Sequence, residues 1–144
     1  MKITIQESEH ITQTEVVIHC RETDDEVLTV VAALSKFNKK LTGTKNDRTF
    51  IIDPADVLYF DSVDKKTFAY TKSEVFEIPL RLYELEEKLL RDFFRASKSA
   101  IINIGKIKSI LPDFGGRIEV TMVTGEKLMV SRQYAHELKK KLEL

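Results

Sequence analysis

The spacing of apolar residues changes along the chain. Ahead of Thr49 it includes one stretch with the α-helical repeat, and from Thr49 onward apolar residues recur mainly at every second position. Before that point, residues 2–7 alternate between apolar and polar positions, and residues 15–20 form an apolar run with β-branched members. Both patterns are typical of strands. The sequence therefore predicts two strands ahead of the first helix.

That first helix is expected over residues 24–41, where apolar residues recur at helical spacing. Thr23 and Glu26 have the spacing of a capping box at its start, and Gly43 is expected to end it. A helix with one apolar stripe has to bury that stripe. We expect it to pack on the rest of the chain or on a second subunit, which makes residues 1–44 a ββα appendage.

From about Thr49 the chain reads as short strands separated by turns, which predicts an antiparallel meander over 48–53, 57–62, 66–71 and 74–78. A short helix with an apolar face is expected after Pro79, carried by Leu82, Leu85 and Leu89. Further strands are expected at 93–95, 100–102, 106–111, 117–123 and 127–130. Ser131 is expected to cap a final helix whose inward face is Tyr134, Ala135, Leu138 and Leu142.

Composition narrows the function only slightly. Hydrophobic residues make up 42% and charged residues 32%, a mixture able to build a core. The 23 basic and 23 acidic residues cancel, so nucleic-acid binding cannot be argued from bulk charge. Cys20 is the only cysteine, which excludes an intramolecular disulfide. The start lacks the apolar core of a signal peptide and no apolar run approaches membrane-spanning length, so a cytoplasmic location is expected.

Candidate catalytic residues are sparse. Metal-ligand spacing is absent among the three histidines, His10, His19 and His136. A carboxylate cluster is suggested by four aspartates, Asp53, Asp56, Asp61 and Asp64. These flank strand ends and turns, where aspartate is common because its side chain bonds the local backbone. Neither an enzymatic activity nor a cofactor is expected.

Basic residues gather in three short polar segments. The first is an expected hairpin turn with Lys65, Lys66 and Thr67, which suits either a phosphate-contacting loop or an ordinary solvated turn. The second, either a loop or a strand, has groups suited to phosphates and base edges, although a polar sheet edge is the alternative: Arg95, Ser97, Lys98 and Ser99. The third is Arg132, in the first turn of the last helix, where the macrodipole disfavours a cation but the amides suit a shared anion.

Three pieces couple apolar runs to these basic segments in a fixed order: VLYFDSVDKKTFAYT, FFRASKSAIINIGKIKSI and LMVSRQYAHELKKKL. With the intervening helix LYELEEKL, they resemble the LytTR family of bacterial DNA-binding domains over roughly residues 45 to 143. The resemblance implies an α+β fold, mostly β, with antiparallel sheets and short helices. It also implies binding of double-stranded DNA through loops, in successive major grooves and the minor groove between them, without a recognition helix.

Carried onto this chain, the family's contact segments correspond to Lys65, Lys66, Thr67, Arg95, Ser97, Lys98, Ser99 and Arg132. The family often has histidine where this chain has Ser97, and its usual phosphoreceiver domain does not fit into residues 1–44. We expect a sequence-specific, homodimeric transcriptional regulator with a DNA-binding domain at 45–144 and a dimerisation or regulatory appendage at 1–44. A regulatory membrane-protein partner is implied by the resemblance alone. The alternative is a protein-interaction module on the same scaffold, without specific DNA binding.

Overall fold

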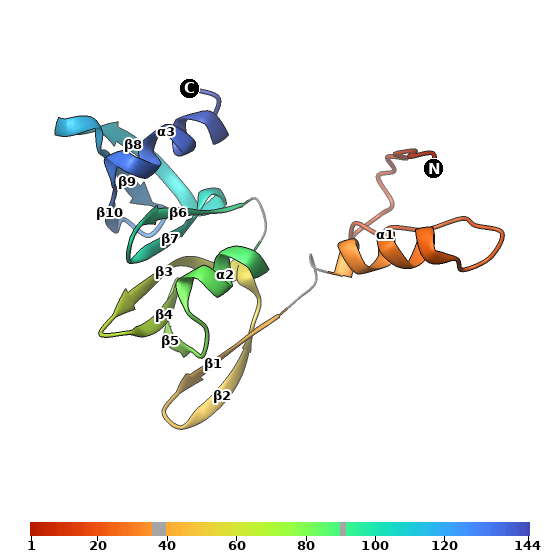
Figure 1. Cartoon of the computed structure of the whole chain (residues 1–144), viewed down its shortest axis with the longest axis horizontal. Coiled ribbons are helices and arrows are strands. Elements are labelled where there is room, and N and C mark those ends of the chain that lie inside the picture. The colour runs from red at the N-terminus through yellow and green to blue at the C-terminus, as the bar shows by residue number, and fades with distance from the viewer. Residues whose placement is uncertain (36–39, 90–91) are drawn as a thin grey trace. The chain divides into compact units, whose positions relative to one another are not determined.

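The computed structural model of the chain describes residues 1–35, 40–89 and 92–144. It divides into two compact units, Met1–Leu34 (unit 1) and Ser35–Leu144 (unit 2). Figure 1 shows helix α1 in unit 1 and all of the labelled strands in unit 2. Within the described ranges no helix is long and apolar enough to cross a membrane.

Unit 1 contains a single helix and no strand. Helix α1 (Asp25–Ser35) begins at Asp24, whose Oδ1 accepts a hydrogen bond from the Val27 amide at 3.0 Å, so Asp24 caps it instead of Thr23. The two strands predicted at residues 2–7 and 15–20 are wrong, because neither segment forms a ladder with a partner. Their apolar side chains are exposed, including Ile3, Ile5, Val16 and Val17.

The helix predicted over residues 24–41 is too long. It ends at Ser35, residues 36–39 lie outside the described ranges, and Leu41 begins strand β1 (Leu41–Lys45) with only 1% of its surface exposed. Gly43 does not end a helix. It lies so close to its neighbours that an added Cβ would come within 2.8 Å of the Phe76 Cβ. Because β1 is part of the sheet, the boundary between the units precedes the predicted 44/45 junction.

Unit 2 is built on a seven-stranded antiparallel sheet of order β2-β1-β5-β4-β3-β7-β6. The other strands are β2 (Arg48–Ile52), β3 (Val57–Val63), β4 (Lys66–Thr71), β5 (Val75–Ile78), β6 (Phe93–Ser97) and β7 (Ala100–Asn103). The predicted meander is confirmed for β3, β4 and β5, whereas β2 pairs with β1. The expected short helix is α2 (Leu82–Lys88), which buries Leu82 and Leu85 in a cluster with Phe60.

A second, three-stranded sheet of order β10-β9-β8 follows in the chain. Its strands are β8 (Ile107–Pro112), β9 (Ile118–Met122) and β10 (Lys127–Val130). The last helix, α3 (Arg132–Lys141), buries Ala135 and Leu138 in a cluster with side chains of β6, β9 and β10, and Tyr134 and Leu142 pack on the same cluster as predicted. Tyr59 of β3 also belongs to this cluster. Burial, with a hydrogen bond to Glu126, raises the pKa of its hydroxyl.

The hairpins of the large sheet turn in two different ways. Asn46 and Asp47 in the β1–β2 turn both have positive φ, as do Asp64 and Lys65 in the β3–β4 turn. Two consecutive positive φ angles belong to the type I′ turn, whose twist matches that of the flanking strands. Neither residue of the β6–β7 turn, Lys98-Ser99, has a positive φ. The β6–β7 turn therefore lacks the type I′ backbone geometry of the β1–β2 and β3–β4 turns.

Candidate nucleic-acid interface

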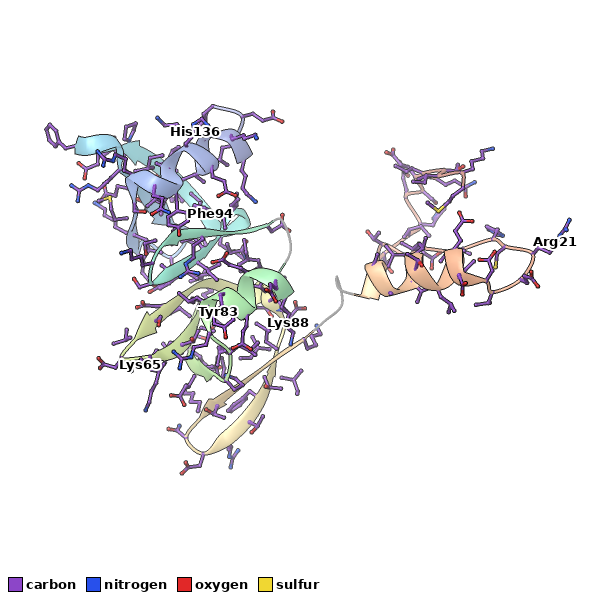
Figure 2. The ribbon with its side chains drawn as sticks, viewed as in Figure 1. Arg21, Lys65, Tyr83, Lys88, Phe94 and His136 are labelled. Carbon is purple, nitrogen blue, oxygen red and sulfur yellow. The ribbon has the colours of Figure 1, made fainter. Side chains whose placement is uncertain are left out.

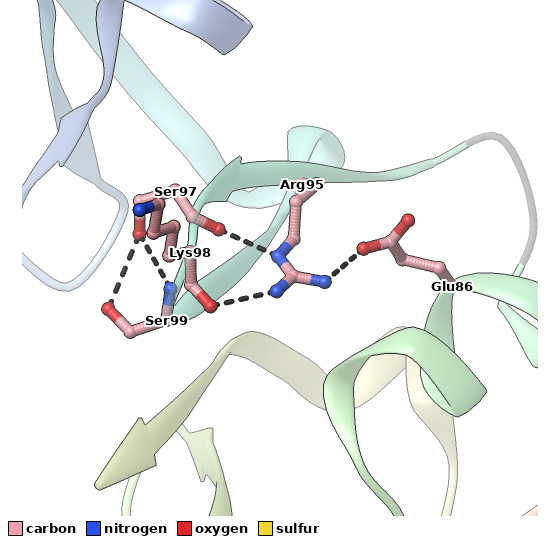
Figure 3. A network of polar contacts seen from close by, with 5 residues as sticks. All are labelled: Glu86, Arg95, Ser97, Lys98 and Ser99. Atoms are coloured by element: carbon pink, nitrogen blue, oxygen red, sulfur yellow. Dashed lines mark hydrogen bonds and ion pairs between the residues drawn. The ribbon is translucent and has the colours of Figure 1, made fainter.

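Four of the residues expected to contact DNA lie in and beside the β6–β7 turn. One of them, Arg95, donates hydrogen bonds to the backbone of the turn. The Arg95 Nε donates to the Ser97 carbonyl and its Nη2 donates to the Lys98 carbonyl, each at 2.7 Å. Nη1 forms an ion pair with Glu86 of α2. Figure 3 shows the guanidinium between that carboxylate and the two carbonyls. Residues 95–97 belong to strand β6 and do not form a loop. The guanidinium of Arg95 is engaged by groups of the chain itself.

The two serines of this turn hydrogen-bond one another, and the lysine between them is exposed. Ser97 Oγ accepts from the Ser99 amide at 3.2 Å and lies 3.4 Å from Ser99 Oγ. This is the local side-chain-to-backbone bonding that serine makes in turns. In the described part of the chain, the Lys98 ammonium has no hydrogen bond or ion pair, and its side chain is exposed.

The start of α3 adjoins this turn. The Ser131 amide donates to the Ala96 carbonyl at 2.9 Å, which ties the helix start to the end of β6. An open cleft lies between the two, lined by Ser97, Lys98, Ser99, Ser131, Arg132 and Gln133. Ser131 occupies the N-cap position as predicted, but its side chain makes no cap hydrogen bond. Its hydroxyl and the first helical amides therefore face a cleft able to accept an anion.

Arg132 is the first residue of α3, as predicted, and it is exposed. Among the described residues its guanidinium has no hydrogen-bond or ion-pair partner. Its aliphatic stem lies against Gly116 of the β8–β9 loop, where an added Cβ would stand 3.1 Å from the Arg132 Cγ. The loop supports the stem and leaves the planar fork available.

The β3–β4 turn supplies a second set of cations. Lys65 stands at the hairpin tip (Figure 2) with φ of 65°, exposed and, in the described ranges, unpaired. Lys66 begins β4 and lies 3.8 Å from a Glu77 carboxylate oxygen, a contact between exposed groups that contributes little. Thr67 is only 3% exposed, so its side chain faces the core and is not available to a ligand.

The three segments lie on the same side of unit 2. In Figure 1 the tips of the β3–β4 and β6–β7 hairpins and the start of α3 all point toward the left of the view. The β6–β7 turn is also joined to β3 by a 2.8 Å hydrogen bond from the Ser62 amide to the Ser99 carbonyl. Lys65, Lys98 and Arg132 thus project unpaired cations from one connected frame. That arrangement suits a polyanion that extends across several turns.

Sequence patterns missed two members of this site. Gln133 lines the cleft beside Arg132, and a side-chain amide there can donate and accept toward base edges. Its place directly after the predicted arginine was the available signal. Glu86 pairs with Arg95 across nine residues of sequence, between a helix and a strand. No local spacing rule connects such positions.

A model of the LytTr DNA-binding domain matches residues 47–143. The chain belongs to this family. Two uncharacterised HTH-type transcriptional regulators of Staphylococcus aureus, from strains NCTC 8325 / PS 47 and COL, are each 30% identical over 146 residues, covering 100% of this chain and 99% of the relative. A solved LytTr DNA-binding domain from Bacillus cereus matches with a TM-score of 0.70 and 30% identity. It covers 73% of this chain and 97% of that one.

The chain belongs to a family of DNA-binding domains, and the order of elements in unit 2 differs from that of a helix-turn-helix protein. The relatives carry the HTH designation. In unit 2, however, α2 and α3 are separated by the five strands β6 to β10, so within the described residues no two helices adjoin as that motif requires. In unit 2 the exposed cations Lys65, Lys98 and Arg132 lie instead at two hairpin tips and at one helix start.

Proposed function

We propose that the chain is a sequence-specific transcriptional regulator that binds double-stranded DNA through the two hairpin tips and the start of α3. The observation that carries the proposal is the grouping of Lys65, Lys98 and Arg132 on one side of a LytTR fold, without intramolecular partners in the described ranges. Some other cations of unit 2, such as Lys40 and Lys45, pair with acids. Unpaired cations at projecting turns suit phosphates and base edges.

The segments divide the work by side-chain chemistry. Lys65 and Lys66 carry point charges on a hairpin and contact phosphates, which positions the domain on the duplex. Arg132 has a planar fork that matches the two acceptors of guanine in the major groove, and Lys98 and the serine hydroxyls read neighbouring base edges. Thr67 drops out of the proposed contact set because it is buried.

The neutral chain places its positive charge locally. Residues 45–144 hold 18 basic and 16 acidic residues, so the DNA-binding region has almost no net charge. Affinity therefore depends on which cations reach phosphates, and log K should fall with log salt by about 0.9 for each phosphate neutralised. A slope set by the few proposed contacts is expected, shallower than that of a strongly basic protein.

Unit 1 provides the proposed means of assembly. Its apolar side chains are exposed on both the helix and the preceding segment, including Leu28, Val31, Val16 and Val17. Contiguous exposed apolar surface is typical of interaction sites. We propose that this unit pairs two copies of the chain, as a regulator reading a two-part site would need. A membrane-protein partner is a proposal drawn from the resemblance, and a cytoplasmic location is a proposal drawn from the sequence pattern.

Selection of bound sites from a random DNA pool by the full chain tests the function. Repeated rounds should enrich a defined motif, and that motif should compete for the protein better than random DNA across a salt series. Binding that never enriches a motif refutes sequence specificity. The absence of DNA binding at low salt, combined with binding to an acidic protein surface, favours the alternative of a protein-interaction module.

A further inference from the structure

Arg95 is a cation of the proposed interface, yet its hydrogen bonds are made within the chain. Of its five N–H donors, three are engaged, by the Ser97 carbonyl, the Lys98 carbonyl and Glu86. Nε and Nη2 form one edge of the guanidinium. That edge donates to two successive carbonyls, in the way that it would donate to the two acceptors of a guanine. The Arg95 side chain is 20% exposed. A fork already used in this way is not free to read guanine.

The turn that Arg95 holds needs such support. Ser97 pairs with Ala100, which leaves Lys98 and Ser99 as a two-residue loop. The favoured loops of this length have positive φ at the first or at both central residues, which neither residue here has. A bulge between Arg95 and Ser97 adds a further irregularity. The hydrogen bonds from Arg95 to the two carbonyls therefore support a turn that lacks these favoured angles.

Glu86 sets the direction of the guanidinium. It lies on α2, whose Leu82 and Leu85 are anchored in the core, so its carboxylate approaches Arg95 from a rigid element. The result is a continuous series of contacts from α2 through Arg95 to the turn (Figure 3). The series continues to α3, because the Ala96 carbonyl between Arg95 and Ser97 accepts the Ser131 amide.

We propose that Glu86 and Arg95 form a brace that shapes the β6–β7 turn for DNA recognition, so that Arg95 is a positioning residue and not a base contact. This inference rests on the proposed function. It assigns a role in DNA recognition to Glu86, an acidic residue on the helix beside the interface. Lys98 and Arg132, on either side of the cleft, are the groups whose placement the brace controls.

The direction in which DNA affinity changes when a carboxylate is removed distinguishes the brace from an ordinary surface acid. Removing a carboxylate near DNA removes repulsion, so an ordinary surface acid replaced by alanine leaves binding unchanged or tightens it. If Glu86 holds the brace, Glu86→Ala weakens binding to the selected motif by about threefold or more, a fraction of the discrimination that a bidentate base contact supplies. Glu87→Ala is the matched control, because Glu87 is the exposed neighbour on α2 and carries the same charge.

The measurements are dissociation constants of the full chain for the selected motif and for random DNA, with thermal melts of each variant. We expect Glu86→Ala to lose motif affinity while random-DNA affinity holds, and Glu86→Gln, which keeps an oxygen acceptor for Nη1, to recover most of the loss. Identical behaviour of the Glu86→Ala and Glu87→Ala variants overturns the brace. So does an equal loss on both DNAs together with a lowered melting temperature, which marks a purely structural contact. If the wild-type chain shows no motif preference, the proposed function itself fails.

Discussion

Replacing Arg132 with alanine separates recognition from folding. The side chain is exposed and, in the described ranges, makes no polar contact, and only its stem touches the chain at Gly116. An exposed substitution of this kind shifts the free energy of unfolding by less than about 0.5 kcal/mol. Removing a cation from the first turn of α3 relieves an unfavourable macrodipole interaction of a few tenths of a kcal/mol, which offsets part of that cost.

The effect on recognition should be much larger. A bidentate arginine–guanine contact supplies about 1–3 kcal/mol of discrimination, so affinity for the selected motif should fall by roughly tenfold or more. Random DNA should lose less, because it loses only a charge. Arg132→Lys should restore that charge without the planar fork and leave most of the specificity loss in place.

The assay is a pair of titrations by fluorescence anisotropy, against motif and random duplexes, with a thermal melt of each variant. Lys140→Ala is the control, since it removes a cation from the exposed far end of the same helix. Equal losses on both duplexes would reduce Arg132 to a phosphate contact. A loss of several kcal/mol in stability would make it a structural residue and refute the reasoning.

Three further changes test other parts of the account. Lys65→Ala with Lys66→Ala should weaken binding to all duplexes alike and flatten the log K against log salt slope by roughly 0.9 per lost contact; an unchanged slope removes this turn from the interface. Gly43→Ala should destabilise unit 2 by about 1–3 kcal/mol in urea unfolding, because the new Cβ meets Phe76; no change would mean that β1 yields easily. Deleting residues 1–34 should leave unit 2 folded, since both core clusters lie beyond that point, but shift sedimentation from dimer to monomer; an unchanged dimer excludes unit 1 as the contact.

The strands that sequence patterns predicted well are those with clear alternation or a continuous apolar run. The run 66–71 was predicted with the bounds that β4 has, and β3 extends one residue beyond its prediction. The pattern missed β1 because its sequence, LTGTK, has one large apolar residue, and its second buried position is a glycine. Whether Gly43 breaks a helix or allows close packing depends on Ile52 and Phe76, which are remote in sequence.

The opposite error occurred in unit 1. Residues 15–20 have a stronger strand pattern than β1, yet they form no strand. Strand propensity mainly records how well side chains pack on a pleated, half-buried surface, and this segment has no such neighbour in unit 1. The exposed Val16 and Val17 are therefore consistent with the proposal that a second molecule covers them.

Within the site, the sequence predicted which elements carry several of the candidate residues, but it did not predict which side chains are free to contact a ligand. Sequence patterns placed Lys65 in a hairpin turn and Arg132 at a helix start, where the structure has them, whereas for the segment with Lys98 a loop and a strand were equally favoured. Thr67 illustrates a signal that was present but unused: it shares a strand face with Ala69, and both are buried. The ion pair between Arg95 and Glu86 had no signal in the sequence, because it depends on how α2 packs against the sheet.

A neutral protein with this surface should recognise DNA by geometry more than by charge. The acids of unit 2 pair with several of its cations, at Lys40, Lys45, Arg95 and Lys127. These pairings leave Lys65, Lys98 and Arg132 at the tips. Because few charges act, weak non-specific attraction is expected, and the free energy of binding must come from contacts that require the turns to keep their shape. The β3–β4 turn keeps its shape through positive φ angles, and the β6–β7 turn through Arg95. The proposed brace therefore makes specificity depend in part on Glu86 and Arg95, two residues that we do not expect to contact DNA.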